Sequence, residues 1–399
     1  MAITRDDCEE LDRRDPIGWV RERFIVPERV VYLDGNSLGA LPASLPGRMA
    51  QVLAKEWGRG LVSSWDGAGW MDAPRRIGDK IARLIGVAPG EVLAADSTTI
   101  ALTKLLLAAL SAGPDRSLLL TTSTNFPSDL YAGEAAARLA GGSLRVVEPP
   151  ALLEELSGAG GVAALYLTHV DYRTGEMFDM EGLTAAAHES GALAVWDLCH
   201  SAGAVALDCG GAGVDLALGC GYKYLNGGPG APSFLYVRSE LQGSLPNALP
   251  GWLGHEAPFG FEGGFRQAPD IAGYLTSSPP VLGLTGLEAG VDTFAGVEME
   301  DVRAKSVRLG QLFLEVVLEE AGGLVGVASP GDPARRGSQI SLRHERASTL
   351  VSELAAAGVV CDFRPPDVCR FGFAPLYLTY REVFDAARKV ATAVVGASR

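Results

Sequence analysis

The sequence predicts an α/β protein built on a mostly parallel sheet with helices on both faces. Beyond residue 114, short apolar runs alternate several times with helical patterns, as in repeated strand–helix units. Apolar residues make up 47 % of the 399 residues and charged residues 21 %, which is typical of a soluble globular protein. A chain of this length can form two or three domains.

The first hundred residues are expected to form a polar arm followed by short alternating elements. In order, these are the arm over 1–29 with a short helix at 19–24, a strand at 30–34, helices at 46–57 and 74–85, and a strand at 91–95. A hydroxyl-rich run, Ser97, Thr98 and Thr99, then opens a helical pattern that continues to residue 110. Hydroxyl residues are common helix N-caps, and the free N–H groups at a helix start can also bind a phosphate.

The central part carries five further strand-like runs and ends in an irregular segment. The runs are 118–121, 144–147, 162–169, 192–197 and 214–218, and a last strand follows at 233–237. Helical patterns at 125–139 and 180–190 separate them. Residues 244–280 show no regular pattern but are rich in Gly and aromatic residues, which favours a functional loop over disorder.

The C-terminal part is expected to be a smaller α+β unit. Long helical patterns cover 280–322, and the remainder contains strands at 338–342 and 359–363 and helices at 346–357 and 380–395. We therefore predict a large α/β domain over 46–285 and a small α+β domain over 286–399. Residues 1–45 are predicted to be an arm that joins the small domain.

The charge balance excludes several classes of partner. With 34 Lys and Arg against 48 Asp and Glu, the net charge is −14, which disfavours nucleic acid and anionic membranes. The acidic start does not resemble a signal peptide, and no apolar run reaches the length of a membrane span. The six cysteines form no C-x-x-C pair and imply no metal site. We expect a cytoplasmic protein.

Two short motifs suggest other functions. Gly35-Asn36-Ser37-Leu38-Gly39 matches the G-x-S-x-G elbow of serine hydrolases, with Ser37 as nucleophile, but such an elbow needs a helix directly after it and prolines follow here. A tight turn is the simpler interpretation. A G-x-G-x-x-A run at 158–163 precedes a strand instead of following one, so we reject a dinucleotide site.

Two residues in the stretch 192–237 point to pyridoxal phosphate chemistry. Asp197 ends one apolar run, and Lys223 lies in a loop of small and aromatic residues after the next. That cofactor needs a lysine amine for its Schiff base and an anionic partner for its pyridinium nitrogen. Desolvation in such a loop is expected to lower the pKa of Lys223 and make it nucleophilic. Alone, either residue could be a surface lysine or a helix cap.

Several polar or aromatic residues follow strand-like runs and are expected to converge. In open α/β sheets, ligands bind beyond the carboxyl ends of the strands. The residues in this position are Thr98, Phe126, Thr168, Asp197 and Lys223. In the C-terminal part, Arg370 follows two prolines between apolar residues, which predicts a buried carboxylate-binding fork or, alternatively, a surface salt bridge.

The chain as a whole resembles the kynureninase family, whose members are fold-type I pyridoxal phosphate enzymes. The similar segments are LDGNSLG at 33–39, FPSD at 126–129, WDLCHSAG at 196–203, YKYLNGG at 222–228, GWLGH at 251–255 and RFG at 370–372. They occur in the family's order and together are specific, whereas Asp and Lys alone would fit many aminotransferases and desulfurases. Leu253 departs from the aromatic residue that is frequent there.

The resemblance implies roles for the matched residues. Lys223, Asp197 and Tyr222 would be catalytic: Lys223 carries the cofactor and then moves the substrate's α-proton, and Asp197 pairs with the pyridinium. Phe126 would stack on the ring. Further cofactor contacts are implied for Thr98, Thr99, Ser128, Asp129, Thr168, His200 and Tyr222, and, from the second subunit of a homodimer with shared active sites, for Trp252 and Ser278. Substrate contacts are implied for Arg370, Asn36 and Leu253.

The implied reaction is hydrolytic cleavage of the Cβ–Cγ bond of L-kynurenine, 3-hydroxy-L-kynurenine or both. The products would be L-alanine and anthranilate or 3-hydroxyanthranilate, in tryptophan degradation that supplies an NAD precursor or a secondary metabolite. The alternatives are another fold-type I lyase or aminotransferase, such as a cysteine desulfurase, and, more remotely, the Ser37 hydrolase.

Overall fold

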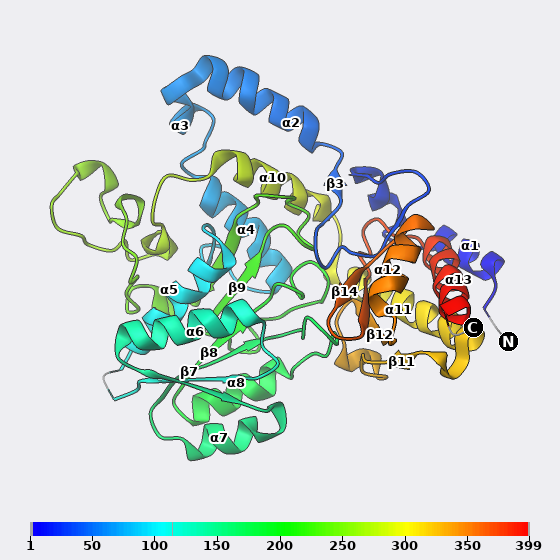
Figure 1. Ribbon diagram of the computed structural model, residues 1–399. Coiled ribbons are helices and arrows are strands. Elements are labelled where there is room, and N and C mark those ends of the chain that lie inside the picture. Colours follow the sequence, from blue (N-terminus) through cyan, green and yellow to red (C-terminus); the bar gives the residue numbers. More distant parts are fainter. Residues whose placement is uncertain (1–2, 114, 398–399) are drawn as a thin grey trace.

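A seven-stranded sheet forms the centre of the large α/β unit in the computed structural model, which describes residues 3–113 and 115–397 (Figure 1). The strand order is β4-β10-β9-β8-β7-β5-β6. Only β10 runs against its neighbours, so the prediction of a mostly parallel sheet is confirmed. The strands are β4 (Val92–Ala94), β5 (Leu118–Thr122), β6 (Ser143–Val147), β7 (Val162–Thr168), β8 (Leu193–Asp197), β9 (Leu216–Cys220) and β10 (Ser233–Val237).

Helices cover both faces of this sheet, and alternate strand residues separate the two cores. Val195 and Leu218 pack into one core with helix α5, whereas Trp196 and Ala217 pack into the other with helix α8. This follows from the two-residue period of a strand, which sends neighbouring side chains to opposite faces. The helices of this unit are α4 (Ala73–Ile85), α5 (Thr98–Ser111), α6 (Pro127–Ala140), α7 (Leu152–Gly158), α8 (Met180–Glu189), α9 (Ser239–Gln242) and α10 (Val281–Val291).

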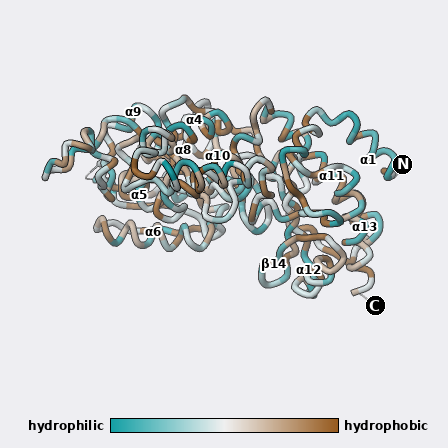
Figure 2. The backbone as a smooth tube through the Cα atoms, turned by 90° about the horizontal axis from the view of Figure 1, so that it is seen from above, coloured by the Kyte–Doolittle hydropathy of each residue, from teal (hydrophilic) through white to brown (hydrophobic). Residues whose placement is uncertain are grey.

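The smaller α+β unit contains a four-stranded antiparallel sheet with order β11-β12-β15-β14. Its strands are β11 (Gly326–Val327), β12 (Gln339–Arg343), β14 (Asp362–Arg364) and β15 (Val368–Gly372), and its helices are α11 (Met299–Ala321), α12 (Ala347–Ala356) and α13 (Tyr380–Ala397). The N-terminal arm joins this unit, because β2 (Val31–Tyr32) pairs in parallel with β13 (Val359–Val360). Helix α1 (Arg5–Arg13) lies beside α13 at the same end of the molecule (Figures 1 and 2).

Several elements differ from the sequence prediction. Helix α1 was not expected; it begins at a capping box in which Thr4 and Asp7 bond each other's backbone N–H groups. The helix expected at 19–24 is a 3₁₀ helix, Gly18–Arg23. The helix expected at 46–57 begins as α2 (Leu45–Gln51) and continues as a π-helix, Val52–Gly60. The single strand expected at 359–363 is two strands, β13 and β14.

The remaining segments are short. Strands β1 (Phe24–Ile25) and β3 (Leu41–Pro42) pair with each other, and α3 (Ser64–Gly67) follows the π-helix. Segment 244–280 contains only 3₁₀ turns, the irregular structure that its sequence predicts. Among the described residues, no helix is long and apolar enough to cross a membrane.

Candidate active site

A cavity of about 250 Å³ lies at the carboxyl edge of the large sheet. Strands β4, β5, β7, β8 and β9 all end at this edge, since β10 is antiparallel to both β4 and β9. Thr168 ends β7, Asp197 ends β8, and Lys223 follows β9. The lining residues are Ser97, Thr98, Thr99, Phe126, Ser128, Asp129, Thr168, Tyr172, Asp197, Cys199, His200, Tyr222 and Lys223.

Lys223 is held in a loop that packs directly against the N-terminal turn. Gly39 donates its N–H to the carbonyl of Tyr222 at 2.8 Å. A Cβ at Gly39 would lie 2.4 Å from the carbonyl oxygen of Lys223, so only glycine allows this approach. The turn at 35–39 therefore supports the lysine loop, which explains a glycine motif that the sequence alone left open.

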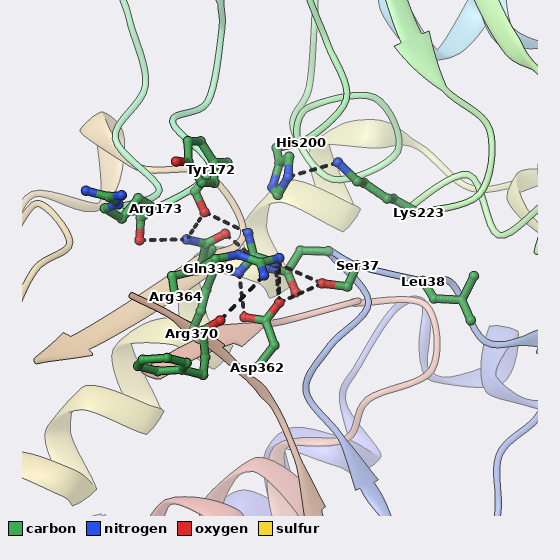
Figure 3. A network of polar contacts seen from close by, with 12 residues as sticks. Ser37, Leu38, Tyr172, Arg173, His200, Lys223, Gln339, Asp362, Arg364 and Arg370 are labelled. Carbon is green, nitrogen blue, oxygen red and sulfur yellow. Dashed lines mark hydrogen bonds and ion pairs between the residues drawn. The ribbon is translucent and has the colours of Figure 1, made fainter. Parts of the chain in front are cut away.

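The Lys223 amine lies 3.1 Å from Nε2 of His200 (Figure 3). Burial lowers the pKa of Lys223, but nearby acidic groups outweigh it and raise the pKa above its ordinary value: Cys220, Cys199, Tyr222 and Asp197. The prediction that desolvation leaves this pKa lowered is therefore wrong for the chain itself. Burial, with the cations Lys223, Arg370 and Arg364, holds the pKa of His200 well below its usual range, so its imidazole is neutral.

Two carboxyl groups, those of Asp129 and Asp197, line the cavity. Asp197 is 6 % exposed, and its Oδ1 accepts the backbone N–H of Cys199 at 2.7 Å. Burial raises the pKa of Asp129 well above its usual range, and the neighbouring Asp197 carboxylate adds to this. Among the described residues, neither Asp129 Oδ2 nor His200 Nδ1 has a hydrogen-bond partner. A ligand with polar groups would satisfy both atoms.

The buried side-chain amide of Asn125 positions Phe126, an aromatic residue that lines the cavity. Oδ1 of Asn125 accepts the backbone N–H of Phe126 at 2.8 Å and also the hydroxyl of Thr168. The Phe126 ring is 40 % exposed, and Tyr172 packs edge-on against it with ring centroids 4.9 Å apart. One face of Phe126 is therefore available for a flat ring.

The start of α5 also lines the cavity, through Ser97, Thr98 and Thr99. Ser97 is the N-cap residue, but its side chain makes no capping hydrogen bond. The first N–H groups of an α-helix have no partner within it and lie at the positive end of its dipole. Thr98 and Thr99 bring their hydroxyls to the same place. This is the arrangement that binds a phosphate.

Arg370 lies outside the cavity lining, in a polar cluster of the small unit (Figure 3). Its side chain is 1 % exposed, so the surface salt-bridge interpretation is wrong. Nε donates to Asp362 Oδ1 at 2.8 Å, NH2 to the other oxygen of Asp362 and to Ser37 Oγ at 2.8 Å, and NH1 to the Tyr172 carbonyl at 2.7 Å. Through Tyr172, this cluster touches the cavity wall.

Asn36 lies in the same cluster, where its side-chain amide meets that of Gln339 at 3.0 Å. Arg364 is a second guanidinium there and contacts Asp362 at 2.8 Å. Two arginines therefore share Asp362, and both also interact electrostatically with the carboxyl group of Asp34. A carboxylate is the group that these guanidinium groups would bind.

A family model for the kynureninase C-terminal domain matches residues 302–390. Over 394 residues the chain is 45 % identical to a kynureninase of Pseudomonas fluorescens, with 96 % of this chain and 94 % of that protein covered. It is 43 % identical over 390 residues to a kynureninase of Burkholderia pseudomallei (strain 1106a), again covering 96 % and 94 %. The chain belongs to the kynureninase family.

The fold agrees with this family. A cysteine desulfurase from Thermococcus onnurineus NA1 superposes with a TM-score of 0.78 at 19 % identity, covering 99 % of this chain and 100 % of that one. The large α/β unit and the smaller α+β unit are thus those of a fold-type I pyridoxal phosphate enzyme, as predicted.

The cavity residues fit the pyridoxal phosphate of the kynureninase family. Asp129 and His200, each with a buried polar atom that has no hydrogen-bond partner in the described chain, line the cavity together with Ser97, Thr98 and Thr99 at the start of α5. The exposed face of Phe126 and the Lys223 amine complete the set of groups that such a cofactor requires.

Three residues implied by the kynureninase resemblance lie away from this cavity within the single chain. Trp252 is 39 % exposed and packs edge-on against Phe259 with centroids 5.8 Å apart. Ser278 is exposed. Leu253 is 6 % exposed and packs into the core beside α5, so it presents little surface to a substrate. Their contacts stay predictions.

The structure does not support the Ser37 hydrolase. The partners of Ser37 Oγ within the described chain are Asp362 and Arg370, and no histidine contacts it. The turn at 35–39 leads into β3, and the next helix begins only at Leu45. An elbow would need a base at the serine and a helix directly after it.

Sequence reasoning missed several residues of the site. Tyr172 and Cys199 line the cavity, and Asp362, Arg364 and Gln339 surround Arg370. Tyr172 could have been found, because it comes shortly after the predicted strand end at Thr168. Asp362 could not, since its pairing with Arg370 depends on the register of β14 against β15.

Proposed function

We propose that this kynureninase-family chain hydrolyses the Cβ–Cγ bond of L-kynurenine, 3-hydroxy-L-kynurenine or both. The products are L-alanine and anthranilate or 3-hydroxyanthranilate. The observation that carries the proposal is Lys223, whose amine lies beside His200 in a cavity bounded by Asp197 and the start of α5. We place the reaction in tryptophan degradation.

The cofactor is held by groups from several strand ends in this proposal. The start of α5, with Thr98 and Thr99, binds the phosphate together with Tyr222, and Phe126 packs on the ring. Asp197 pairs with the pyridine nitrogen. Ser128, Asp129, Thr168 and His200 provide the remaining contacts. When bound, pyridoxal phosphate supplies an electron sink that stabilises negative charge on the substrate's carbon skeleton.

Lys223 is the proposed proton carrier. Its pKa is raised in the chain itself, so the amine would have to lose a proton to act as the nucleophile that holds the cofactor. A free, neutral Lys223 amine would take the proton from the substrate's Cα. The neutral His200 imidazole at 3.1 Å can accept a hydrogen bond from the Lys223 ammonium and orient it.

Arg370 is the proposed site for the substrate's α-carboxylate, with Asn36 beside it. The guanidinium is buried and already oriented by Asp362, Ser37 and the Tyr172 carbonyl. Because two of its nitrogens already bond to Asp362, the guanidinium would have to turn or exchange that partner to form a two-point pair with a carboxylate. Leu253 is proposed to act on the aryl end indirectly, through the packing of the Trp252 loop.

We also propose a homodimer in which Trp252 and Ser278 reach the partner's active site. Exposed apolar side chains on the projecting segment after α2 and on the aromatic loop support a partner surface: Trp57, Leu61, Val62, Phe259 and Phe261. The proposed cytoplasmic location rests on the acidic sequence and on six cysteines that are buried free thiols.

The test combines a spectrum, a trap and a product assay. The purified protein is expected to be yellow, and borohydride followed by peptide mass analysis is expected to place the reduced cofactor on Lys223. Incubation with L-kynurenine should release anthranilate and alanine in equal amounts, and Lys223→Ala should release neither. Release of sulfide from L-cysteine instead, or a cofactor attached to another lysine, would refute the proposal.

A further inference from the structure

Lys104 is a buried lysine on α5 for which the proposed reaction has no use. Its side chain is 0 % exposed and lies in the apolar core between α5 and the sheet. Nζ contacts Asp96 Oδ2 at 2.5 Å and donates to the carbonyl of Tyr274 at 2.8 Å. Burying an ammonium group is costly even when it is paired, and an apolar side chain would fill the same space without that cost.

The ion pair holds a residue with positive φ at the point where β4 turns into α5. Asp96 has φ +58°, a left-handed conformation that is uncommon outside glycine and that Asp and Asn adopt more often than other residues. Its carbonyl accepts the N–H of Ser233 at 3.1 Å, and it directly precedes Ser97, the N-cap of α5. The conformation of Asp96 therefore decides where the first N–H groups of α5 point.

Lys104 also connects this turn to the irregular segment 244–280. Tyr274 ends the 3₁₀ helix Ile271–Tyr274 of that segment, and its hydroxyl donates to the Leu245 carbonyl at 3.0 Å. The Lys104 ammonium group thus contacts both the turn before α5 and the segment that carries Trp252 and Ser278. Both parts contain residues that we propose as cofactor contacts.

We propose that the Lys104–Asp96 ion pair is a positioning device for the cofactor's phosphate site. By fixing the left-handed turn at Asp96, the pair aims the free N–H groups at the start of α5 into the cavity. This rests on the proposed phosphate role of Thr98 and Thr99. The cavity itself supports a ligand at this place, because Asp129 and His200, which line it, each have a buried polar atom without a hydrogen-bond partner in the described chain.

The test separates binding of the phosphate from binding of the ring. Apoenzyme of the full chain is titrated with pyridoxal phosphate and with pyridoxal, which lacks the phosphate, and the two dissociation constants are compared. Lys104→Met is expected to weaken pyridoxal phosphate binding about tenfold or more, about 1.4 kcal/mol, and to leave pyridoxal within about twofold. Asp96→Asn, which keeps a residue tolerant of positive φ, should act in the same direction if Lys104→Met does not fold.

A matched control is Lys305→Met. Lys305 is another buried lysine, with its side chain 3 % exposed and Nζ 2.6 Å from Asp15 in the small unit. The Lys305→Met substitution should lower the free energy of unfolding without changing the ratio of the dissociation constants for pyridoxal phosphate and pyridoxal. If the Lys104 and Lys305 variants behave alike, Lys104 serves stability only and the proposal is overturned.

A variant of the phosphate site itself distinguishes the remaining outcomes. The double substitution Thr98→Ala, Thr99→Ala is expected to shift the ratio in the same direction as Lys104→Met. If this variant shifts the ratio and Lys104→Met does not, the phosphate site stands and the positioning role of Lys104 is wrong. If neither shifts it, the phosphate assignment is wrong and the positioning role fails with it.

Discussion

Arg370 and Asp362 face each other across β15 and β14, and both carboxylate oxygens of Asp362 accept hydrogen bonds from the Arg370 guanidinium. The proposed carboxylate site is therefore already ion-paired within the chain. Arg364 contacts the same aspartate at 2.8 Å, so Asp362 keeps a cationic partner if Arg370 turns toward a substrate. Asp34 also interacts electrostatically with both arginines, so the cluster holds two cations and two carboxyl groups before a substrate binds.

Removing Arg370 is expected to impair every amino-acid substrate equally. Arg370→Ala should lower kcat/KM for kynurenine and 3-hydroxykynurenine by the same factor, equivalent to ~2–4 kcal/mol, because the lost charge-assisted bonds go to a group that both share. Arg364→Ala is the matched control, with a smaller loss expected. Steady-state kinetics on both substrates decide it, and a ratio of specificity constants that moves with Arg370 would place Arg370 at the aryl end.

Most of the large unit could be predicted from the sequence because its signals are local. The strands predicted at 118–121, 144–147 and 233–237 lie within about a residue of β5, β6 and β10. The short strands β11 and β13 are only two residues long, and they depend on partners far away in the chain. Local patterns carry no information about such pairing.

Several cavity residues could be predicted because each follows a strand with a local sequence signal. The Arg370 cluster could not be predicted in this way. Thr168 and Asp197 end adjacent parallel strands, so their convergence follows from topology alone. Leu253 shows the limit of the approach: its position in a family motif suggests a ring contact, which stays a prediction, and its burial beside α5 could not be predicted from local patterns. Tertiary contacts decide which part of the protein the side chain of a loop residue packs against.

Gly39 is expected to tolerate no side chain. Gly39→Ala would bring a Cβ within 2.4 Å of the Lys223 carbonyl oxygen and 2.6 Å of Asn226 Cα, so the lysine loop must shift. We expect a loss of ~1–3 kcal/mol in unfolding free energy and weaker cofactor binding. Gly47→Ala, where a Cβ meets nothing within 4 Å inside α2, should instead be neutral or stabilising by up to ~1 kcal/mol. Denaturant melts of both variants test this, and equal effects would contradict it.

Ser37 is expected to orient Arg370 and not to act as a nucleophile. Ser37→Ala removes one hydrogen bond to the guanidinium, so kcat/KM for kynurenine should fall by the equivalent of ~0.5–1.5 kcal/mol. The parent protein should not react with serine-directed acylating reagents. Mass spectrometry after reagent treatment tests this, and stoichiometric labelling of Ser37 with loss of activity would restore the hydrolase interpretation.

Asp34, two residues after β2 and beside the Arg370 cluster, is expected to make stability depend on pH. Burial, reinforced by the Asp362 carboxylate, raises the pKa of Asp34 from 3.8 to about 6. Below pH 3.8 the carboxyl is protonated in both the folded and the unfolded chain. As the pH rises from 3.8 to about 6, the unfolded chain loses its proton first, so the folded state loses stability over this window. Above about pH 6 the loss of folding stability stays constant, at ~2–3 kcal/mol for a pKa shift of this size.

Asp34→Asn cannot ionise and should therefore be more stable than the parent at pH 7.5 by ~2–3 kcal/mol. The difference should shrink steadily below pH 6 and vanish near pH 4, because the parent carboxyl then becomes neutral in the folded chain too. Urea denaturation of both proteins at several pH values measures it. Asp66→Asn, at an exposed position, controls for the loss of one negative charge. A stability difference that stays the same at pH 4 and pH 7.5 would show that Asp34 ionises in the folded protein as it does in the unfolded chain.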